Sequence, residues 1–330
     1  MMGYIKAINY YLPETIISND LLGTELQGVE NVAKGMGVES RHKAACHETA
    51  SDMAVRAAEQ LFEENKIDRS SIDFLLFCTQ SPDYFMPSTS CIIQDRLGLP
   101  KTTGAFGYDL GCSGYVYGLA IANSFVDSGL AHNVLLLTGD TISKYLHPED
   151  KNRVLFGDAA SATLISTEGM ARIGKFELGT DGSGCEHIMI RNGANRQRQM
   201  TQQCRTDENG MIHRDDYFDM DGEAVFGFTV ECVPQIIKGS LEKNGLSSDD
   251  VDYYVFHQAN KYMLNTLRKL NKLPKDNFFV DLSDTGNTTS STVPIGLVKS
   301  LKDSRIHQDM KVMVAGFGVG LSWAGTILNF

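Results

Sequence analysis

The stretch Ile67-Asp-Arg-Ser-Ser-Ile-Asp-Phe-Leu-Leu-Phe77 is matched later in the chain by Leu246-Ser-Ser-Asp-Asp-Val-Asp-Tyr-Tyr-Val-Phe256. In both, an aliphatic residue precedes a four-residue polar turn, an aliphatic–Asp pair and an apolar run typical of a buried strand. Each follows a segment with helical periodicity, which predicts helices over residues 50–65 and 225–244. The chain therefore repeats a helix–turn–strand unit.

Three further matches follow in the same order in both halves. They pair Asp109-Leu-Gly-Cys112 with Asp284-Thr-Gly-Asn287, Asn133-Val-Leu-Leu-Leu137 with Lys311-Val-Met-Val-Ala315, and Ala162-Thr-Leu-Ile165 with Gly325-Thr-Ile-Leu328. Four matches in register indicate an internal duplication. Because apolar strands alternate with helices, we predict an α/β fold with two similar, mainly parallel sheets packed through helices. The predicted halves are 1–169 and 170–330.

Composition narrows the class of protein. The 330 residues carry a formal net charge of −11, which disfavours nucleic acid as a general partner. No apolar run approaches the length of a membrane span, and the first residues alternate like a strand, so we expect neither a membrane segment nor a secretory signal. The cysteines are odd in number and form no Cys-x-x-Cys pair, which argues against metal ribbons and favours a reducing cytoplasm; they stand at positions 46, 78, 91, 112, 185, 204 and 232.

A polar stretch between residues 180 and 216 interrupts the repeat. It is rich in Asn, Arg, Gln and Gly. Two interpretations stay open, a solvated surface loop and a lid over a site, because long loops in compact domains are either mobile or functional.

The candidate nucleophile is Cys112, which stands between glycines at the start of an apolar, helix-like segment. A helix N-terminus favours a thiolate, and flanking glycines let a substrate approach the sulfur, although most cysteines are small buried hydrophobes. His257 and Asn287 follow the equivalent strands of the second half, and strand ends converge in such folds. We therefore expect these three side chains to meet.

Cysteine, histidine and asparagine together suit acyl transfer. A thiolate can hold an acyl group covalently, and the N–H groups of His257 and Asn287 can stabilise the enolate formed when a malonyl thioester loses carbon dioxide. Cysteine proteases use the same residue types, but the α/β duplication does not favour them. The glycine-rich stretch Ala315-Gly-Phe-Gly-Val-Gly-Leu-Ser-Trp323 lies too near the C-terminus for a nucleotide-binding unit, which leaves a backbone oxyanion hole or plain backbone packing.

The chain resembles β-ketoacyl-acyl-carrier-protein synthase III, of the thiolase-like superfamily, from Tyr4 to Phe330. The motifs that carry the resemblance are Asp109-Leu-Gly-Cys-Ser-Gly-Tyr115, Leu155-Phe-Gly-Asp-Ala-Ala160, His257-Gln-Ala-Asn260, Gly286-Asn-Thr288 and Gly316-Phe-Gly-Val-Gly-Leu-Ser-Trp323. The resemblance implies a thiolase-like five-layered αβαβα fold, a homodimer, and no cofactor beyond acyl thioesters of coenzyme A or of a carrier.

The resemblance also implies a reaction. Cys112 would take an acyl primer from a thioester and pass it to malonyl-acyl carrier protein in a decarboxylative Claisen condensation. His257 and Asn287 would activate the malonyl thioester. Phe317 would lie beside them, and the backbone N–H groups of Cys112 and Val319 would form the oxyanion hole.

Two further expectations concern protein partners. Met86 matches the residue that reaches into the acyl pocket of the second subunit. Acyl carrier proteins of this kind are acidic, and Lys261, Arg268 and Lys269 on the helix after His257 offer a basic docking face, unless they are only a solvated helix face.

The chain departs from the family where coenzyme A is usually held. Asn31 and Gly35 replace a tryptophan and an arginine, and Tyr262 replaces another arginine. Three interpretations therefore stay open: a carrier-bound primer in place of coenzyme A, an acyltransferase that acylates a non-malonyl acceptor, and a non-catalytic binding subunit. The presence of Cys112, His257 and Asn287 argues against the last.

Overall fold

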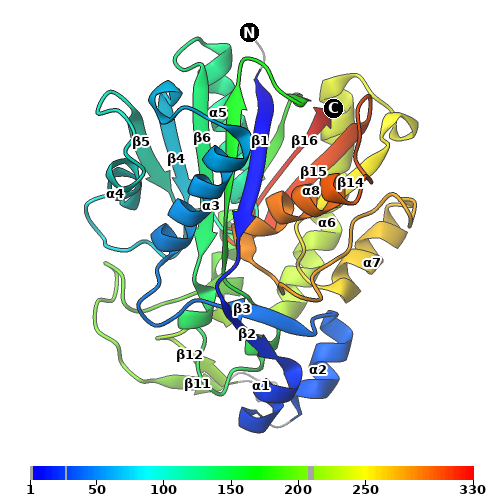
Figure 1. Ribbon diagram of the computed structural model, residues 1–330. Coiled ribbons are helices and arrows are strands. Elements are labelled where there is room, and N and C mark those ends of the chain that lie inside the picture. The colour runs from blue at the N-terminus through cyan, green and yellow to red at the C-terminus, as the bar shows by residue number, and fades with distance from the viewer. Residues whose placement is uncertain (1–2, 27, 207–211) are drawn as a thin grey trace.

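The computed structural model describes residues 3–26, 28–206 and 212–330. Its main sheet has ten strands, and nine of them follow one path in the order β14-β15-β16-β8-β1-β7-β6-β4-β5, while β9 pairs with β16 (Figure 1). The first half supplies the strands β1 (Tyr4–Tyr11), β4 (Phe74–Cys78), β5 (Gly104–Tyr108), β6 (Asn133–Asp140) and β7 (Ala159–Ser166). The second half supplies β8 (Ala171–Ile173), β9 (Glu177–Thr180), β14 (Tyr253–Phe256), β15 (Lys311–Gly318) and β16 (Ser322–Asn329).

The two halves have the same strand topology. In the first, β4 pairs with β6 in parallel, and β6, β7 and β1 continue antiparallel. In the second, β14 pairs with β15 in parallel, and β15, β16 and β8 continue antiparallel. The place of β5 is taken by a parallel bridge between Tyr254 and Phe278. The sequence boundary at residue 169 falls between β7 and β8.

The two half-sheets are joined and not separate. β1 and β8 form a short antiparallel ladder that pairs Tyr4 with Arg172 and Ile5 with Ala171. The expectation of two similar, mainly parallel sheets therefore needs correction, because backbone hydrogen bonds join the halves into one continuous sheet of mixed strand direction. The first strand of each half supplies this joint, so each half satisfies an edge that would otherwise be open.

Helices complete five layers. The main helices are α3 (Ala50–Asn65), α4 (Thr89–Arg96), α5 (Gly114–Asp127), α6 (Gly222–Asn244), α7 (Lys261–Leu270) and α8 (Thr292–Lys302). α5 contacts β4 and β6 on one side and β15 and β16 on the other, α8 contacts strands of both halves, α3 packs on the first half-sheet, and α6 packs on the second. The predicted αβαβα order is therefore confirmed, because α5 and α8 contact strands of both halves and form the middle layer.

Local sequence explains where the two repeated helices begin and end. Thr49 caps α3 in a reciprocal pair with Asp52, and the helix ends at Lys66 in a left-handed conformation. The prediction for 50–65 is thus confirmed. α6 begins three residues before the predicted start, because the Asp221 side chain accepts the N–H groups of Glu223 and Ala224.

Shorter elements surround the lower end of the main sheet. They are the strands β2 (Thr15–Ser18), β3 (Ser40–Lys43), β10 (Ile188–Met189), β11 (Cys204–Thr206), β12 (Ile212–Arg214) and β13 (Asp219–Met220), and the helices α1 (Asn19–Glu25) and α2 (Val29–Met36). The described residues also form six 3-10 turns: η1 (Arg69–Ser71), η2 (Ile142–Lys144), η3 (Lys151–Val154), η4 (Gly182–His187), η5 (Ser248–Asp250) and η6 (Thr289–Ser291).

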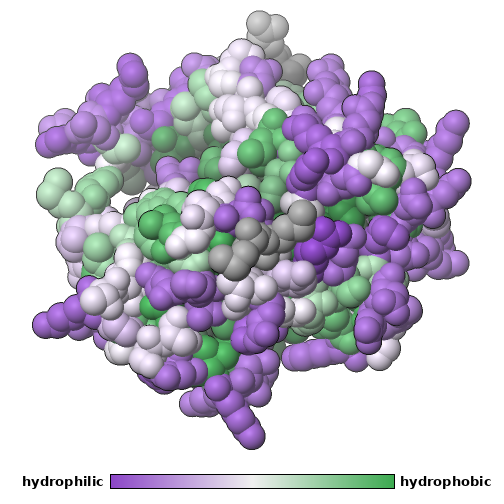
Figure 2. Space-filling model, turned by 90° about the horizontal axis from the view of Figure 1, so that it is seen from above, coloured by the Kyte–Doolittle hydropathy of each residue, from purple (hydrophilic) through white to green (hydrophobic). Residues whose placement is uncertain are grey.

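The opposite, upper face is seen in Figure 2. Hydrophilic residues dominate its rim, and hydrophobic residues are scattered in separate areas. No helix in the described part of the chain combines the length and the hydropathy that a membrane crossing requires.

Candidate active site

A cavity of about 960 Å³ lies where β14 and β15 of the second half end near the loop after β5 of the first. Its lining includes Cys112, His257 and Asn287, together with Phe317 and Val319. The structure thus brings the three predicted reactive side chains together with two of the predicted neighbours, from four separate segments of the chain.

Cys112 lies in the turn between β5 and α5, pressed against the end of β15. A Cβ on Gly316 would stand 2.6 Å from the Cys112 carbonyl oxygen, and one on Gly318 would stand 2.8 Å from the Cys112 sulfur. Only glycine permits backbones to approach so closely. A hydrogen bond of 2.7 Å between the Ser113 and Ser322 hydroxyls joins the same two segments.

The backbone N–H groups of Val319 and of Cys112 itself act to lower the pKa of the Cys112 thiol. Burial of the sulfur acts more strongly in the opposite direction, and the negative charge of Asp140 adds to it, so the pKa of the thiol rises to about 12. The expectation that the helix N-terminus yields a resting thiolate is therefore wrong. Burial of the sulfur and the charge of Asp140 favour the neutral thiol.

His257 follows β14 directly and is 2% exposed. Its backbone N–H donates to the Ala315 carbonyl at 2.7 Å, which aligns it with β15, and its ring meets the Phe317 ring edge-on at 5.8 Å between centroids. Burial lowers the pKa of His257 to about 3, so the imidazole is neutral at pH 7.

The Thr292 hydroxyl controls which ring nitrogen of His257 carries the proton. It lies 2.7 Å from His257 Nδ1 and 3.0 Å from the Thr289 carbonyl oxygen. When the hydroxyl donates to that carbonyl, Nδ1 carries the ring proton and Nε2 is an acceptor. When it donates to Nδ1, the ring proton moves to Nε2, which becomes a donor.

The backbone of Asn287 is hydrogen-bonded to the segment Leu155–Gly157 of the first half. Its N–H donates to the Leu155 carbonyl at 2.8 Å, and its own carbonyl accepts the N–H of Gly157 at 3.1 Å. Gly286 has a φ of +64°, and a Cβ there would stand 2.5 Å from the Leu155 oxygen. Glycines in the Leu-Phe-Gly and Gly-Asn motifs therefore allow the two backbone segments to approach each other closely.

Hydrogen bonds fix the orientation of the Asn287 amide. The Thr289 N–H donates to Asn287 Oδ1 at 2.9 Å, so the oxygen points to η6. One N–H of Asn287 Nδ2 reaches the Ala259 carbonyl at 3.4 Å. The second N–H is left to serve as a donor to a ligand in the cavity.

Comparisons with known proteins agree with this geometry. A family model described as 3-oxoacyl-(acyl-carrier-protein) synthase III matches residues 106–182, and the model of its C-terminal region matches residues 241–330. A curated β-ketoacyl-(acyl-carrier-protein) synthase III from Chlamydia muridarum is 33% identical over 100% of this chain and 99% of its own. The chain belongs to this family.

Solved structures of synthase III proteins share the whole fold. One crystal structure of a 3-oxoacyl-(acyl-carrier-protein) synthase III is 40% identical, with a TM-score of 0.95 and full coverage of both chains. A 3-oxoacyl-(acyl-carrier-protein) synthase from Burkholderia xenovorans is 32% identical, with a TM-score of 0.92 over 99% of this chain and 94% of its own.

A buried carboxylate beside the site of this synthase III family member escaped the sequence analysis. Asp140 ends β6, is 1% exposed, and accepts hydrogen bonds from the Gln80 N–H at 2.7 Å and from the hydroxyls of Thr289 and Ser290. Burial raises its pKa to about 6. The available signal was an aspartate closing the otherwise uncharged strand Asn133–Asp140.

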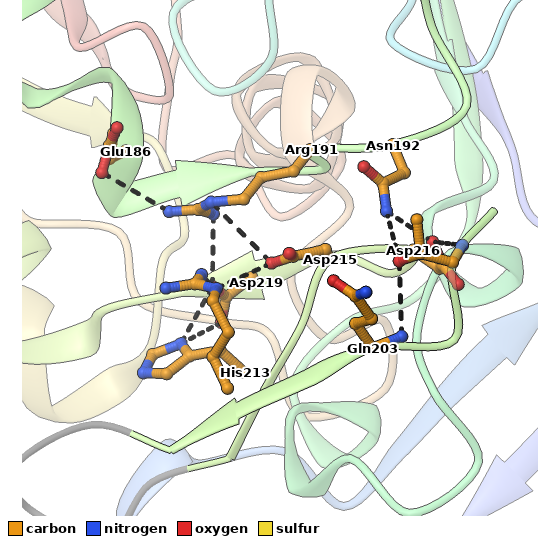
Figure 3. Close-up of polar contacts among 10 residues, drawn as sticks. Glu186, Arg191, Asn192, Gln203, His213, Asp215, Asp216 and Asp219 are labelled. Carbon is orange, nitrogen blue, oxygen red and sulfur yellow. Dashed lines mark hydrogen bonds and ion pairs between the residues drawn. The ribbon is translucent and has the colours of Figure 1, made fainter. Parts of the chain in front are cut away.

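The stretch 180–216 contributes a wall of the cavity, through Ile188, Ile212 and Arg214. Figure 3 shows the polar network behind that wall, in which Asp219 binds His213 at 2.7 Å and Arg191 at 3.5 Å. Nearby, Asp216 accepts the Asn192 side-chain amide at 2.7 Å. Residues 207–211 of this stretch lie outside the described part of the chain.

The remaining predicted residues lie at or beyond the rim. Met86 is 82% exposed and lies outside the lining of this cavity. Lys261 and Lys269 are exposed on α7, whereas Arg268 is half-buried and donates to the Leu273 carbonyl at 3.1 Å. Of the three residues predicted for carrier docking, only the two lysines are therefore fully exposed.

The three departures from the family pattern lie on two helices. Tyr262 is on the rim, where its ring lies 6.0 Å from that of Phe226. Gly35 is exposed on α2, and the side chain of Asn31 on the same helix is outside the described part of the structure.

Proposed function

We propose that this protein condenses an acyl group bound to Cys112 with malonyl-acyl carrier protein, giving a 3-oxoacyl thioester and carbon dioxide. One observation supports this most directly. Cys112 shares one cavity with a neutral histidine and an oriented asparagine. Membership of the synthase III family gives the same reaction class.

The first step is acylation. The Cys112 sulfur forms a bond to the carbonyl carbon of the primer thioester, and the negative charge on that oxygen is stabilised by the N–H groups of Cys112 and Val319. The old carbon–sulfur bond breaks, and the thiol proton leaves with the departing thiol. His257 Nε2 can accept that proton in passing while Nδ1–H is held by Thr292.

The second step is condensation. Asn287 Nδ2–H and His257 Nε2–H donate to the malonyl thioester oxygen, so the bond to the carboxylate breaks and carbon dioxide leaves an enolate. The enolate carbon attacks the acyl group, the bond to the Cys112 sulfur breaks, and the sulfur takes up a proton from water. The Thr292 hydroxyl turns from the Thr289 carbonyl to Nδ1 between the two steps.

The protein works as a homodimer in this proposal. β5 is the last strand of the sheet path, and the adjoining Tyr84, Phe85 and Met86 are 62%, 86% and 82% exposed. An open edge beside adjacent apolar side chains fits pairing with a second copy, which would place Met86 against the acyl group of the partner. Sedimentation of the double variant Tyr84→Ser with Phe85→Ser tests this proposal. If the variant sediments as a dimer like the wild type, these residues do not form the dimer interface.

The donor thioester would enter past Tyr262 and Phe226, with the carrier protein on Lys261 and Lys269. The seven free cysteines fit a reducing cytoplasm, where such carriers would be met.

The decisive experiment is mass spectrometry of Cys112 after incubation with acyl thioesters of coenzyme A and of carrier protein, over several chain lengths. The proposal predicts one stable acyl adduct and release of carbon dioxide from malonyl-carrier. An adduct that is passed on without release of carbon dioxide would favour an acyltransferase acting on a non-malonyl acceptor. Absence of both adduct and turnover would leave a binding subunit.

A further inference from the structure

Thr289 has an uncommon backbone conformation at the centre of the site. Its φ is +52°, in the left-handed region, and it is 4% exposed. A β-branched residue is disfavoured there, so the surrounding structure must hold it in place.

Each backbone polar group of Thr289 serves one of the two donors proposed to bind malonate. Its N–H donates to Asn287 Oδ1 at 2.9 Å, which directs Nδ2 away from η6. Its carbonyl accepts the Thr292 hydroxyl at 3.0 Å in the resting site, and this places that hydroxyl 2.7 Å from His257 Nδ1, to which it can donate during condensation. A rotation of this one peptide would disturb the amide and the imidazole together.

The carboxylate of Asp140 holds Thr289 in place through hydrogen bonds. Its carboxylate accepts the hydroxyls of Thr289 and, at 2.8 Å, of Ser290, and it is itself fixed by the Gln80 N–H. The bond from Thr289 to Asp140 joins residues 149 positions apart, one in each half. A hydrogen bond to a buried ionised group is among the stronger kinds, which suits the task of holding a strained residue.

We propose that Asp140 and Thr289 form a positioning pair, in which the carboxylate of the first half holds Thr289 in its left-handed conformation and thereby orients Asn287 and His257 for condensation. The pair touches no reacting atom. The inference rests on the proposed condensation, because that reaction gives Asn287 and His257 their roles.

The chain offers a matched control for this pair. Thr138, also on β6, bonds the Ser291 hydroxyl of η6 at 2.8 Å. Thr138→Val therefore breaks a buried hydroxyl bridge between the same two elements without touching Thr289 or Asp140. Any effect of general loosening of η6 would appear in this variant.

The test measures three quantities in wild type, Asp140→Asn, Thr289→Gly and Thr138→Val. They are the condensation rate, the acylation rate of Cys112, and the pH profile of Cys112 alkylation by iodoacetamide. Thr289→Gly keeps the left-handed backbone accessible while removing the anchored hydroxyl, so it remains informative if Asp140→Asn fails to fold.

We expect condensation to fall about 10- to 100-fold in Asp140→Asn and Thr289→Gly, as misplacement of catalytic groups produces, with acylation and KM little changed. The alkylation profile should move to lower pH only in Asp140→Asn, because that variant removes the negative charge that raises the pKa of the thiol. A purely structural role would lower acylation and condensation together. Thr138→Val should condense near the wild-type rate.

Wild-type condensation rates in Thr289→Gly or Asp140→Asn would overturn the inference, and so would an equal loss in Thr138→Val. A wild-type protein that releases no carbon dioxide from malonyl-carrier would instead refute the proposed function itself, whatever the variants do.

Discussion

The Cys112 loop and the Asn287 loop occupy equivalent places in the two halves, each before a helix of the middle layer, yet they are built by different means. The sulfur of Cys112 lies against the glycines of β15, and the backbone N–H groups of Cys112 and Val319 act to lower its pKa. A buried carboxylate, a row of hydroxyls and the left-handed Thr289 surround the amide of Asn287.

The difference follows from what each side chain has to do. A nucleophile needs room and donors near the atom it attacks, which glycines and main-chain N–H groups provide. An amide that must present one N–H in one direction needs its other polar atoms occupied, which a hydrogen-bond network provides. In both cases part of the support comes from the opposite half of the chain: β15 and Val319 for Cys112, and Asp140 for the loop of Asn287.

The largest effect is expected from removing the nucleophile. In Cys112→Ala the acyl adduct should disappear and condensation should fall by about 10³-fold or more, while decarboxylation of malonyl-carrier continues at the intact Asn287 side. Mass spectrometry and carbon dioxide release measure the two. Loss of decarboxylation together with acylation would contradict a division of labour between the loops.

The complementary experiment removes the amide of the second loop in Asn287→Ala. Removing one donor to the developing enolate should lower decarboxylation and condensation about 10²- to 10³-fold while leaving the Cys112 adduct intact. Asn265→Ala, which removes an exposed amide on α7, is the control. An adduct yield that falls as far as decarboxylation would mean that the loops act as one.

Gly318→Ala should damage the Cys112 loop selectively. The added methyl would meet the Cys112 sulfur at 2.8 Å, so we expect about 1–3 kcal/mol lower stability and slower acylation. Gly227→Ala, in the interior of α6 with open space around it, should stabilise by up to about 1 kcal/mol. Thermal unfolding measures the stability of both variants, and the rate of adduct formation measures their acylation. Equal stability and acylation in the two variants would contradict the claim that Gly318 is needed for close approach to the Cys112 sulfur.

The pH dependence of stability should distinguish the two halves. The pKa of His257 falls from 6.5 to about 3 on folding, so between these values the unfolded chain binds more protons and stability declines as pH falls. The pKa of Asp140 rises from 3.8 to about 6, so over that window folding takes up a proton and stability increases as pH falls.

Urea denaturation between pH 4 and 7 measures the balance. His257→Gln should lose less stability than wild type on acidification, and Asp140→Asn should lose more. Shifts in the opposite directions would show that one of the two groups is not desolvated as the structure has it.

The smallest effect concerns the proposed docking of the carrier protein on α7 of the second half. Lys261→Glu with Lys269→Glu should raise KM for the carrier substrate about 3- to 10-fold at low salt and less at high salt. Acylation by a small pantetheine thioester should be unchanged, as should every constant in Lys175→Glu, which alters an exposed lysine before β9. Equal loss with both kinds of thioester would remove the docking face.

The predictions from sequence were strongest where a pattern is local. The bounds of α3 and the repeated strands of both halves follow from apolar periodicity, whereas the five-layered order came from the family resemblance. Convergence of Cys112, His257 and Asn287 followed from the repeat, because equivalent strand ends meet at one edge of such sheets.

What the predictions missed depends on contacts between distant parts of the chain. The run of hydroxyl residues after Asn287 was visible, but its bond to Asp140 spans the two halves. The helix position of Cys112 suggested a thiolate, whereas burial by β15 and the charge of Asp140 give a neutral thiol.

The sequence by itself determined the duplicated layers and the three reactive residue types, because helix and strand periodicity and motif spacing are properties of neighbouring residues. Only the tertiary structure decided the protonation of Cys112 and His257, the direction of the Asn287 amide and the conformation of Thr289. Each of these depends on desolvation and on hydrogen bonds across the two halves, which form only when the chain has folded.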